Sequence, residues 1–348
     1  MTRRLFRNAA AGLVAGTLAL IAASAGYAGP VVEDAAGRAI ALPDRVERVF
    51  PAGPPAAIML YSLAPEKLMG WPRAMRPDEA AFLPSDHVAL PTLGRLTGRG
   101  NTTPLEAVVA MRPDLIIDVG STDATYVALA ERVQGQLKVP YALLDGRFAQ
   151  TAETYRRLGR MVGAEARAEE LARHVEATLA EIAGRVARVP PAERPRVYYA
   201  RGPRGLETGL GGSINVETIE FLGARNVAAE TTGGLAAVSL EQVLRWDPAI
   251  IVTVDERFAA SVGKEPAWRA VRAVREGRVH LVPGLPFGWV DFPPAVNRLI
   301  GLRWLARLLY PALFPEDLRL QTAEFYQRFY HRAPSAAQLD QLLGALGR

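Results

Sequence analysis

The sequence contains the same helix–proline–strand segment twice, and this internal repeat constrains the fold more than any other feature. Residues 105–117 (LEAVVAMRPDLII) align without a gap on residues 240–252 (LEQVLRWDPAIIV), at an offset of 135 residues. A leucine, a glutamate, an apolar pair, a proline and an apolar run recur in register. Any two β-α units share part of this pattern, but the identically placed glutamates are more specific. The repeat therefore predicts two lobes of similar architecture.

A long helical stretch separates the two copies. Along residues 164–187, apolar residues recur at spacings of three or four, at Leu171, Val175, Leu179, Ile182 and Val186. This spacing makes one apolar stripe on an otherwise charged helix. About 24 helical residues are roughly 36 Å long, and a proline-rich segment at 190–195 ends the helix. We expect this helix to cross between the lobes.

Strand and helix patterns alternate on both sides of this stretch. Continuous apolar runs at 115–119 and 250–254 indicate buried strands, and the alternation with helices favours parallel sheets. We therefore expect an α/β fold of two Rossmann-like lobes joined by one long backbone helix, with a ligand cleft between the lobes. The expected division is a signal peptide at 1–28, an N-terminal lobe at 29–150, connecting helices including the bridging helix at 151–189, and a C-terminal lobe with the terminal helices at 190–348.

The first 28 residues have the pattern of a secretory signal peptide. Three arginines (Arg3, Arg4 and Arg7) precede the uncharged apolar run 9–23, and small residues stand before Gly29. The alternative is a membrane anchor, but the run is shorter than the roughly 20 residues that a span needs. We expect cleavage near Ala28 and a periplasmic protein.

Composition and missing motifs exclude several classes of function. The chain has no cysteine, which removes disulfides, thiolate metal ligands and cysteine nucleophiles. The net charge is +5, but three arginines lie in the signal segment and no basic stripe with interleaved aromatics remains, so we expect no nucleic-acid partner. The four histidines form no metal motif, and GxSxG and the nucleotide P-loop are absent. We expect no metal site, no cofactor and no enzymatic activity.

Several segments together resemble the class III periplasmic substrate-binding proteins of ABC importers. They include the opening VEDAAGR, the two LE…P blocks, and the segments YYARGPRGLETG, GSIN, PPAVNRLIG and FYQRFY. The last four look most like the molybdate-type branch. The resemblance implies a monomer that delivers a small-molecule ligand to an inner-membrane permease with its ATPase. We rank an iron–siderophore-type chelate first, molybdate or tungstate second, and cobalamin or haem third. A periplasmic enzyme on the same scaffold is the competing class.

The two glutamates of the repeat, Glu106 and Glu241, match the family position that contacts arginines of the permease. Two exposed carboxylates held apart by a rigid bridge can orient a bilobed protein on a two-fold partner. The alternative is that each glutamate only stabilises the first turn of its helix. The symmetric pair favours docking.

A glycine-rich loop opens the second half, after the predicted strand 197–200. Arg201, Gly209, Gly212 and Ser213 (with Gly211) lie between this strand and a predicted helix at 215–222. Such loops bring backbone N–H groups close to a ligand, and a helix N-terminus favours an anion. The alternative is a turn in which Ser213 caps the helix.

Further cationic and aromatic residues follow predicted strands in Gly/Pro-rich segments. A guanidinium suits an oxyanion or a carboxylate-bearing chelate, while aromatic rings stack on flat ligands. Each of these residues could instead belong to the core or the surface. The candidates for the cleft are Arg73, Arg95, Tyr199, Phe287 and Trp289, with Trp71 beside them.

Overall fold

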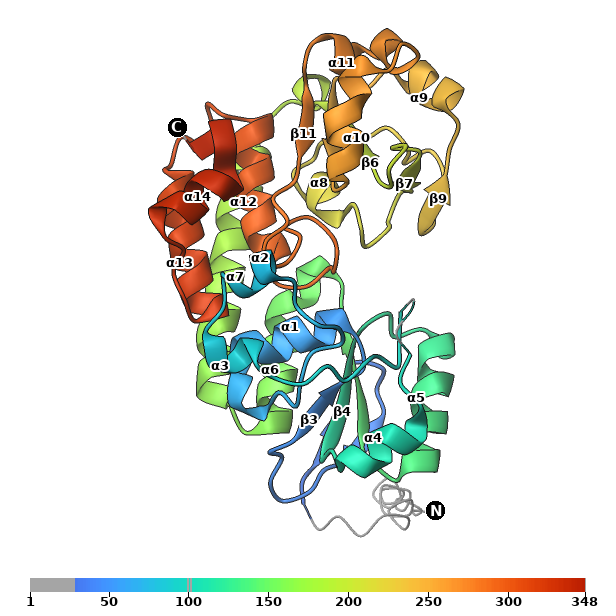
Figure 1. The fold of residues 1–348 in the computed structure, drawn as a ribbon, viewed down its shortest axis with the longest axis vertical. Helices are drawn as coiled ribbons and strands as arrows, with labels where there is room; N and C mark the ends of the chain where they lie inside the picture. Colours follow the sequence, from blue (N-terminus) through green and yellow to red (C-terminus); the bar gives the residue numbers. More distant parts are fainter. Residues whose placement is uncertain (1–28, 99, 101, 348) are drawn as a thin grey trace, which may run out of the picture.

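The computed structural model describes residues 29–98, 100 and 102–347, so the predicted signal peptide lies outside the described residues. Two α/β lobes are stacked along the long axis of the molecule, the N-terminal lobe below and the C-terminal lobe above in Figure 1. This arrangement confirms the predicted fold class.

The N-terminal lobe is built on a three-stranded parallel sheet in the order β3-β4-β5. The strands are almost fully buried, as expected for a parallel sheet covered by helices on its faces. A small antiparallel hairpin, β1–β2, precedes it. The elements are β1 Val31–Glu33, β2 Ala39–Ala41, β3 Val49–Pro51, α1 Pro54–Leu63, α2 Pro77–Ala80, α3 Ser85–Val88, α4 Leu105–Met111, β4 Leu115–Gly120, α5 Ala124–Leu137 and β5 Tyr141–Asp145.

The C-terminal lobe has a four-stranded parallel sheet in the order β11-β10-β6-β8. A short antiparallel pair, β7–β9, lies beside it. The elements are β6 Arg196–Ala200, β7 Glu207–Gly209, α8 Glu217–Phe221, β8 Arg225–Asn226, β9 Leu235–Ala237, α9 Leu240–Trp246, β10 Ile250–Thr253, α10 Glu256–Ser261, α11 Arg272–Arg275 and β11 Val279–Leu281.

The sequence repeat is also a structural repeat. Helices α4 and α9 both have seven residues, and each ends at a residue in the left-handed conformation, Arg112 (φ 51°) and Asp247 (φ 39°). A proline follows in both copies, and the chain then enters the central region of its sheet as β4 or β10. The same helix end therefore directs the chain into each sheet.

The predicted bridging helix is α7, Glu165–Val186, within one residue of the expected bounds at each end. It follows α6, Thr151–Val162, after a turn at Gly163 with φ +68°. The two helices pack closely at Gly159, where an added Cβ would lie only 2.4 Å from the Cβ of Ala168. The apolar stripe of α7 faces the core, with Leu171, Val175 and Ile182 fully buried, and the helix runs between the lobes (Figure 1).

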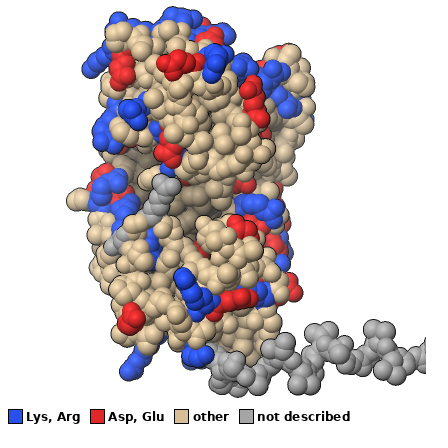
Figure 2. Space-filling model, turned by 90° about the vertical axis from the view of Figure 1, so that its right-hand side faces the viewer, with Lys and Arg blue, Asp and Glu red and all other residues tan. Residues whose placement is uncertain are grey.

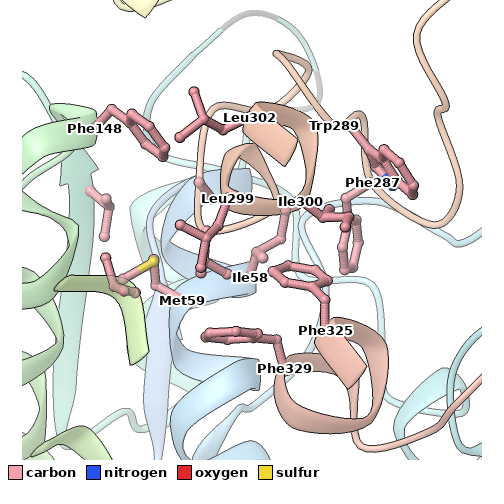
Figure 3. Close-up of a cluster of buried hydrophobic side chains, with 14 of the residues drawn as sticks. Ile58, Met59, Phe148, Phe287, Trp289, Leu299, Ile300, Leu302, Phe325 and Phe329 are labelled. Carbon is pink, nitrogen blue, oxygen red and sulfur yellow. The ribbon is translucent and has the colours of Figure 1, made fainter. Parts of the chain in front are cut away.

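The terminal helices, which the predicted division places with the C-terminal lobe, also contact the N-terminal lobe. They are α12 Arg298–Leu309, α13 Leu318–Tyr330 and α14 Ala336–Leu343. The Tyr61 hydroxyl of α1 donates to the carbonyl of Tyr330 (2.8 Å), and Arg332 donates to the carbonyl of Leu83 (3.1 Å). Figure 3 shows side chains of α1, α12 and α13 packed in one buried cluster. Apolar faces of α12 and α13 meet that of α1, so one core spans both lobes on this side.

A buried arginine adds a polar contact between the lobes. Arg298, at the start of α12, is 1% exposed and donates to the Gly146 carbonyl after β5 (2.7 Å) and to Glu217 of α8 (2.6 Å). Glu217 also accepts from the backbone N–H of Phe148 (2.9 Å), whose ring lies 5.1 Å from the guanidinium. Together with the apolar packing, this contact joins the lobes along one side of the molecule.

Two further segments have irregular structure. Residues 68–71 make only isolated bridges, Val49 with Leu68 and Trp71 with Thr92, and Pro72 follows. Residues 268–275 are divided into a 3₁₀ turn and α11, because Val271 has an extended backbone.

Candidate ligand-binding cleft

The open side of the molecule is a cleft between the lobes. In Figure 1 the strands of both sheets direct their carboxyl ends toward the gap between the lobes. Figure 2 shows that the surface is hollowed there, between the upper and lower halves. The loops that follow parallel strands are where α/β sheets bind ligands, so the walls of this cleft are the candidate site.

Arg201 lies on the C-terminal wall, directly after β6. The residue is only 8% exposed, and its Nε lies 3.5 Å from a carboxylate oxygen of Asp291. The ring of Phe292 covers the guanidinium at 5.2 Å and is itself 65% exposed. One terminal nitrogen, Nη1, has no hydrogen-bond acceptor among the described residues, and the carboxylate of Glu207 is 3.8 Å away. A buried donor without an acceptor is costly, so this nitrogen is suited to an anionic ligand.

Asp291 is the centre of a hydrogen-bond network behind Arg201. Its carboxylate accepts from the Tyr199 hydroxyl (2.8 Å), from the Asn215 amide (2.8 Å) and from the backbone N–H of Phe292 (2.7 Å). Asn215 in turn accepts from the Ser213 hydroxyl (3.0 Å). One carboxylate thus connects Arg201 to the glycine-rich loop.

The glycine-rich loop is built differently from the prediction. Helix α8 begins at Glu217 and its N-cap is Val216, so the alternative of a Ser213 cap is wrong, and no helix N-terminus lies directly at the loop. The space around Gly209 leaves no room for a side chain, since an added Cβ would lie 2.6 Å from the Val216 side chain. Gly212 adopts φ +75°, and its N–H donates to Glu220 (3.4 Å). The loop therefore supports the Arg201 wall and offers fewer free amides than expected.

The two arginines predicted on the N-terminal lobe have different surroundings. Arg73 makes a two-pronged ion pair with the buried Glu79, with contacts of 2.7 and 2.6 Å. Its guanidinium is therefore already engaged in holding α2. Arg95 is partly buried, and its Nε has no hydrogen-bond acceptor within the described part of the chain. Of the two, Arg95 is the better candidate for a ligand contact.

The predicted aromatic residues lie in the core rather than on the cleft surface. Tyr199 and Trp289 are fully buried, and Phe287 is 7% exposed. Phe287 packs on Trp71 of the N-terminal lobe (5.9 Å between ring centroids), and Trp289 donates to the Tyr326 hydroxyl (3.1 Å). Figure 3 shows Phe287 and Trp289 in the buried cluster, and Tyr199 belongs to the same core, which spans both lobes. These rings are not free to stack on a flat ligand in this structure.

A buried polar cluster in the N-terminal lobe was missed by the sequence analysis. Asp118, near the carboxyl end of β4, is 4% exposed and accepts from the Thr97 and Tyr141 hydroxyls, both at 3.1 Å. Burial raises the pKa of Asp118 above its usual value. An acid inside an otherwise apolar strand (LIIDV) was the sequence feature that could have indicated it.

Glu106 and Glu241 occupy equivalent exposed positions in the first turns of α4 and α9. The residue two positions later, Val108 or Val243, is fully buried in each helix. Hydrogen bonds within the first turn of α9, to its backbone and to Ser239, lower the pKa of Glu241. Figure 1 shows the two helices near opposite ends of the molecule.

Two hollows are found on the surface of the described residues. The larger, about 560 Å³, is between residues 96–98 and α5. The smaller, about 230 Å³, lies against α7, α12 and α13 and is lined by charged residues that include Arg185 and Arg303. Neither contains a residue predicted for the ligand site.

The described residues contain no cluster of three or more histidine and acidic side chains that could hold a metal ion. Among the helices of residues 29–98, 100 and 102–347, none is long and apolar enough to cross a membrane.

Comparisons with known proteins agree on one class. A family model described as "Periplasmic binding protein" matches residues 68–284. The molybdate-binding protein MolA of Haemophilus influenzae is 26% identical over 333 residues, covering 86% of this chain and 90% of MolA. The structure of an ABC transporter solute binding protein from Sulfurospirillum deleyianum superposes with a TM-score of 0.81, at 30% identity and with 90% and 98% of the two chains covered. The molybdate-bound structure of MolA superposes with a TM-score of 0.75 at 21% identity, over 88% and 99% of the chains.

Proposed function

Because the chain belongs to the periplasmic binding protein family, as the substrate-binding component of an ABC transporter, we propose that its ligand is a small oxyanion such as molybdate or tungstate. The protein captures this anion in the cleft and delivers it to the inner-membrane permease and its ATPase. It acts as a monomer in the periplasm. This proposal places the oxyanion above the iron chelate that the sequence alone ranked first.

The observation that carries the proposal is the environment of Arg201. Its guanidinium is held below the surface, and one nitrogen has no acceptor in the described part of the chain. Charge-assisted hydrogen bonds to an anion are strong in such a partly desolvated place. The similarity to a molybdate-binding protein over most of both chains supports the same ligand class.

The buried aromatic residues argue against a bulky chelate. Tyr199, Phe287 and Trp289, which could have stacked on an apolar or flat ligand, are in the core. The exposed ring at this wall, Phe292, already lies over Arg201. A compact tetrahedral anion needs charged donors and little stacking surface, so the C-terminal wall fits it better.

Calorimetry on the protein purified from the periplasm tests the choice of ligand. We expect molybdate and tungstate to bind with similar affinity, because both are tetrahedral dianions of similar size. Sulfate serves as the smaller control anion, and a ferric catecholate chelate as the bulky competitor. Saturable binding of the chelate, with no heat from molybdate or tungstate, would overturn the oxyanion proposal and restore the iron-chelate alternative.

The joined side of the molecule supports a small closing motion. Three features resist a wide separation of the lobes: the bridging helix α7, the core shared by α1, α12 and α13, and the Arg298 contact. We propose that ligand capture involves a limited tilt of one lobe toward the other, in contrast to hinge closure of large amplitude.

Reversing the two repeat glutamates is expected to separate transport from binding. In the double variant Glu106→Lys and Glu241→Lys, we expect uptake by cells to fall about fivefold, because the new charges would repel permease arginines. Ligand affinity should stay within about twofold, since both side chains are exposed and solvent screens their charges. Unchanged uptake in cells that carry only the double variant would contradict the docking role.

A further inference from the structure

We infer that Asp291 is a positioning residue, which orients Arg201 so that one guanidinium nitrogen stays available to the anion. This inference rests on the proposed oxyanion function and adds a residue that determines how well the site works. Asp291 is 1% exposed, so it acts through its neighbours and not by contact with the solvent-filled cleft.

The carboxylate joins three segments of the chain, at residues 199–201, 215 and 291–292. Its Oδ2 accepts from the Tyr199 hydroxyl of β6 (2.8 Å) and lies 3.5 Å from Nε of Arg201. Its Oδ1 accepts from Asn215 (2.8 Å), in the loop before α8, and from the N–H of Phe292 (2.7 Å). Since each oxygen has two neighbouring donors, the carboxylate is held from several directions and can act as a fixed support.

The position of this support decides which part of the guanidinium is left free. Asp291 faces Nε, on the inner edge of the group, and the Phe292 ring covers one face at 5.2 Å. Nη1 is left without a hydrogen-bond acceptor in the described structure. A flexible arginine loses conformational freedom when it binds a ligand, and prior support by Asp291 reduces that loss.

A second acid near the same guanidinium provides a natural contrast. Glu207 lies 3.8 Å from Nη1, the nitrogen proposed to meet the anion, and its side chain is 42% exposed. Among the described residues, no hydrogen bond joins this carboxylate to the guanidinium of Arg201, and its ion-pair contact is with Nη1. Glu207 therefore repels an anion and competes for Nη1, whereas Asp291 supports the opposite edge.

This contrast gives the two neutral variants opposite expected effects. If the acids acted only through their negative charge, Asp291→Asn and Glu207→Gln would both tighten the binding of molybdate. Positioning predicts that Asp291→Asn weakens it about tenfold, because the amide nitrogen cannot accept the hydrogen bonds that hold the network. Glu207→Gln should tighten it by about threefold, as expected for a partly exposed repulsive charge.

The test is a double-mutant cycle measured by calorimetry with molybdate on the full periplasmic protein. Asp291→Asn is measured alone and combined with Arg201→Ala. We expect Asp291→Asn alone to weaken molybdate binding about tenfold. Added to Arg201→Ala, the same substitution should weaken binding by less than a further twofold, because Asp291 has no arginine left to position. Tyr199→Phe removes one hydrogen bond to Asp291 without changing the charge, and it should weaken molybdate binding about threefold. This variant replaces Asp291→Asn in the test if Asp291→Asn does not fold.

The outcomes separate this inference from the function on which it rests. Absence of molybdate and tungstate binding by the unaltered protein would overturn both. Normal binding that is lost in Arg201→Ala but is tightened or unchanged in Asp291→Asn would retain the oxyanion function and overturn positioning by Asp291. Positioning by Asp291 would also be overturned if Asp291→Asn weakened molybdate binding equally with and without Arg201. If the aspartate variant cannot be purified, unchanged molybdate affinity in Tyr199→Phe would overturn it.

Discussion

Replacing Arg298 with methionine is expected to lower the free energy of unfolding by about 3–5 kcal/mol, the usual effect of removing one partner of a buried ion pair. Arg298 is 1% exposed, and its loss removes the cation from Glu217, which keeps the N–H of Phe148, and the donor from the Gly146 carbonyl. Methionine fills a similar volume, so the effect reports lost polar contacts more than a cavity. The measurement is chemical unfolding followed by circular dichroism.

A matched arginine on the surface provides the control. Arg173 pairs with Glu169 one turn earlier on α7, but its side chain is 75% exposed. Exposed pairs of this kind contribute about 0.3–0.5 kcal/mol, so Arg173→Met should change stability by less than about 1 kcal/mol. If Arg298→Met were no more destabilising than Arg173→Met, the contact between Arg298, Glu217 and Gly146 would not hold the lobes together.

Removing Arg201 is expected to have the largest effect on ligand binding. Losing a charge-assisted hydrogen bond costs about 1.5–3 kcal/mol, so Arg201→Ala should weaken the binding of molybdate roughly 10- to 100-fold. Because Arg201→Ala leaves the buried Asp291 carboxylate without its guanidinium neighbour, the fold of the variant is first checked by circular dichroism. Calorimetry on the folded variant measures the loss.

Arg204 is the control for this prediction, because it lies in the same loop but is exposed. Arg204→Ala should change affinity by no more than about twofold, as expected for a solvent-screened charge. Equal affinities of Arg201→Ala and the unaltered protein would assign the Arg201 loop a structural role only. The site would then lie on the N-terminal wall, where Arg95 has an unpartnered Nε in the described structure.

Local sequence patterns predicted the framework of this protein well. The repeat, the apolar stripe of α7 and the prolines that follow α4 and α9 depend on neighbouring residues, and the structure confirms two lobes and a bridging helix. Arg201 was predicted as a site residue from its place after a strand; the structure places it beside Asp291, and its contact with a ligand stays a prediction. Patterns with a fixed local period carry enough information for elements of this kind.

Features that depend on contacts between distant segments were predicted poorly. Nothing near Trp289 indicates that α13 covers it with Tyr326, and nothing in the terminal helices indicates that they pack on α1. Asp291 was missed because its partners, Tyr199 and Asn215, are 92 and 76 residues away. Whether an aromatic side chain lines a cleft or fills a core is decided by such long-range packing.

Locating a bound anion in crystals tests directly whether the cleft between the lobes holds an oxyanion through Arg201. Anomalous X-ray scattering at a tungsten edge, from crystals grown with tungstate, locates the anion directly because of the electron-rich metal. We predict one strong peak in the cleft, with a tungstate oxygen within hydrogen-bond distance of Nη1 of Arg201, and no such peak in Arg201→Ala crystals. A peak away from both cleft walls, or a peak that is unchanged in the Arg201→Ala crystals, would contradict this prediction.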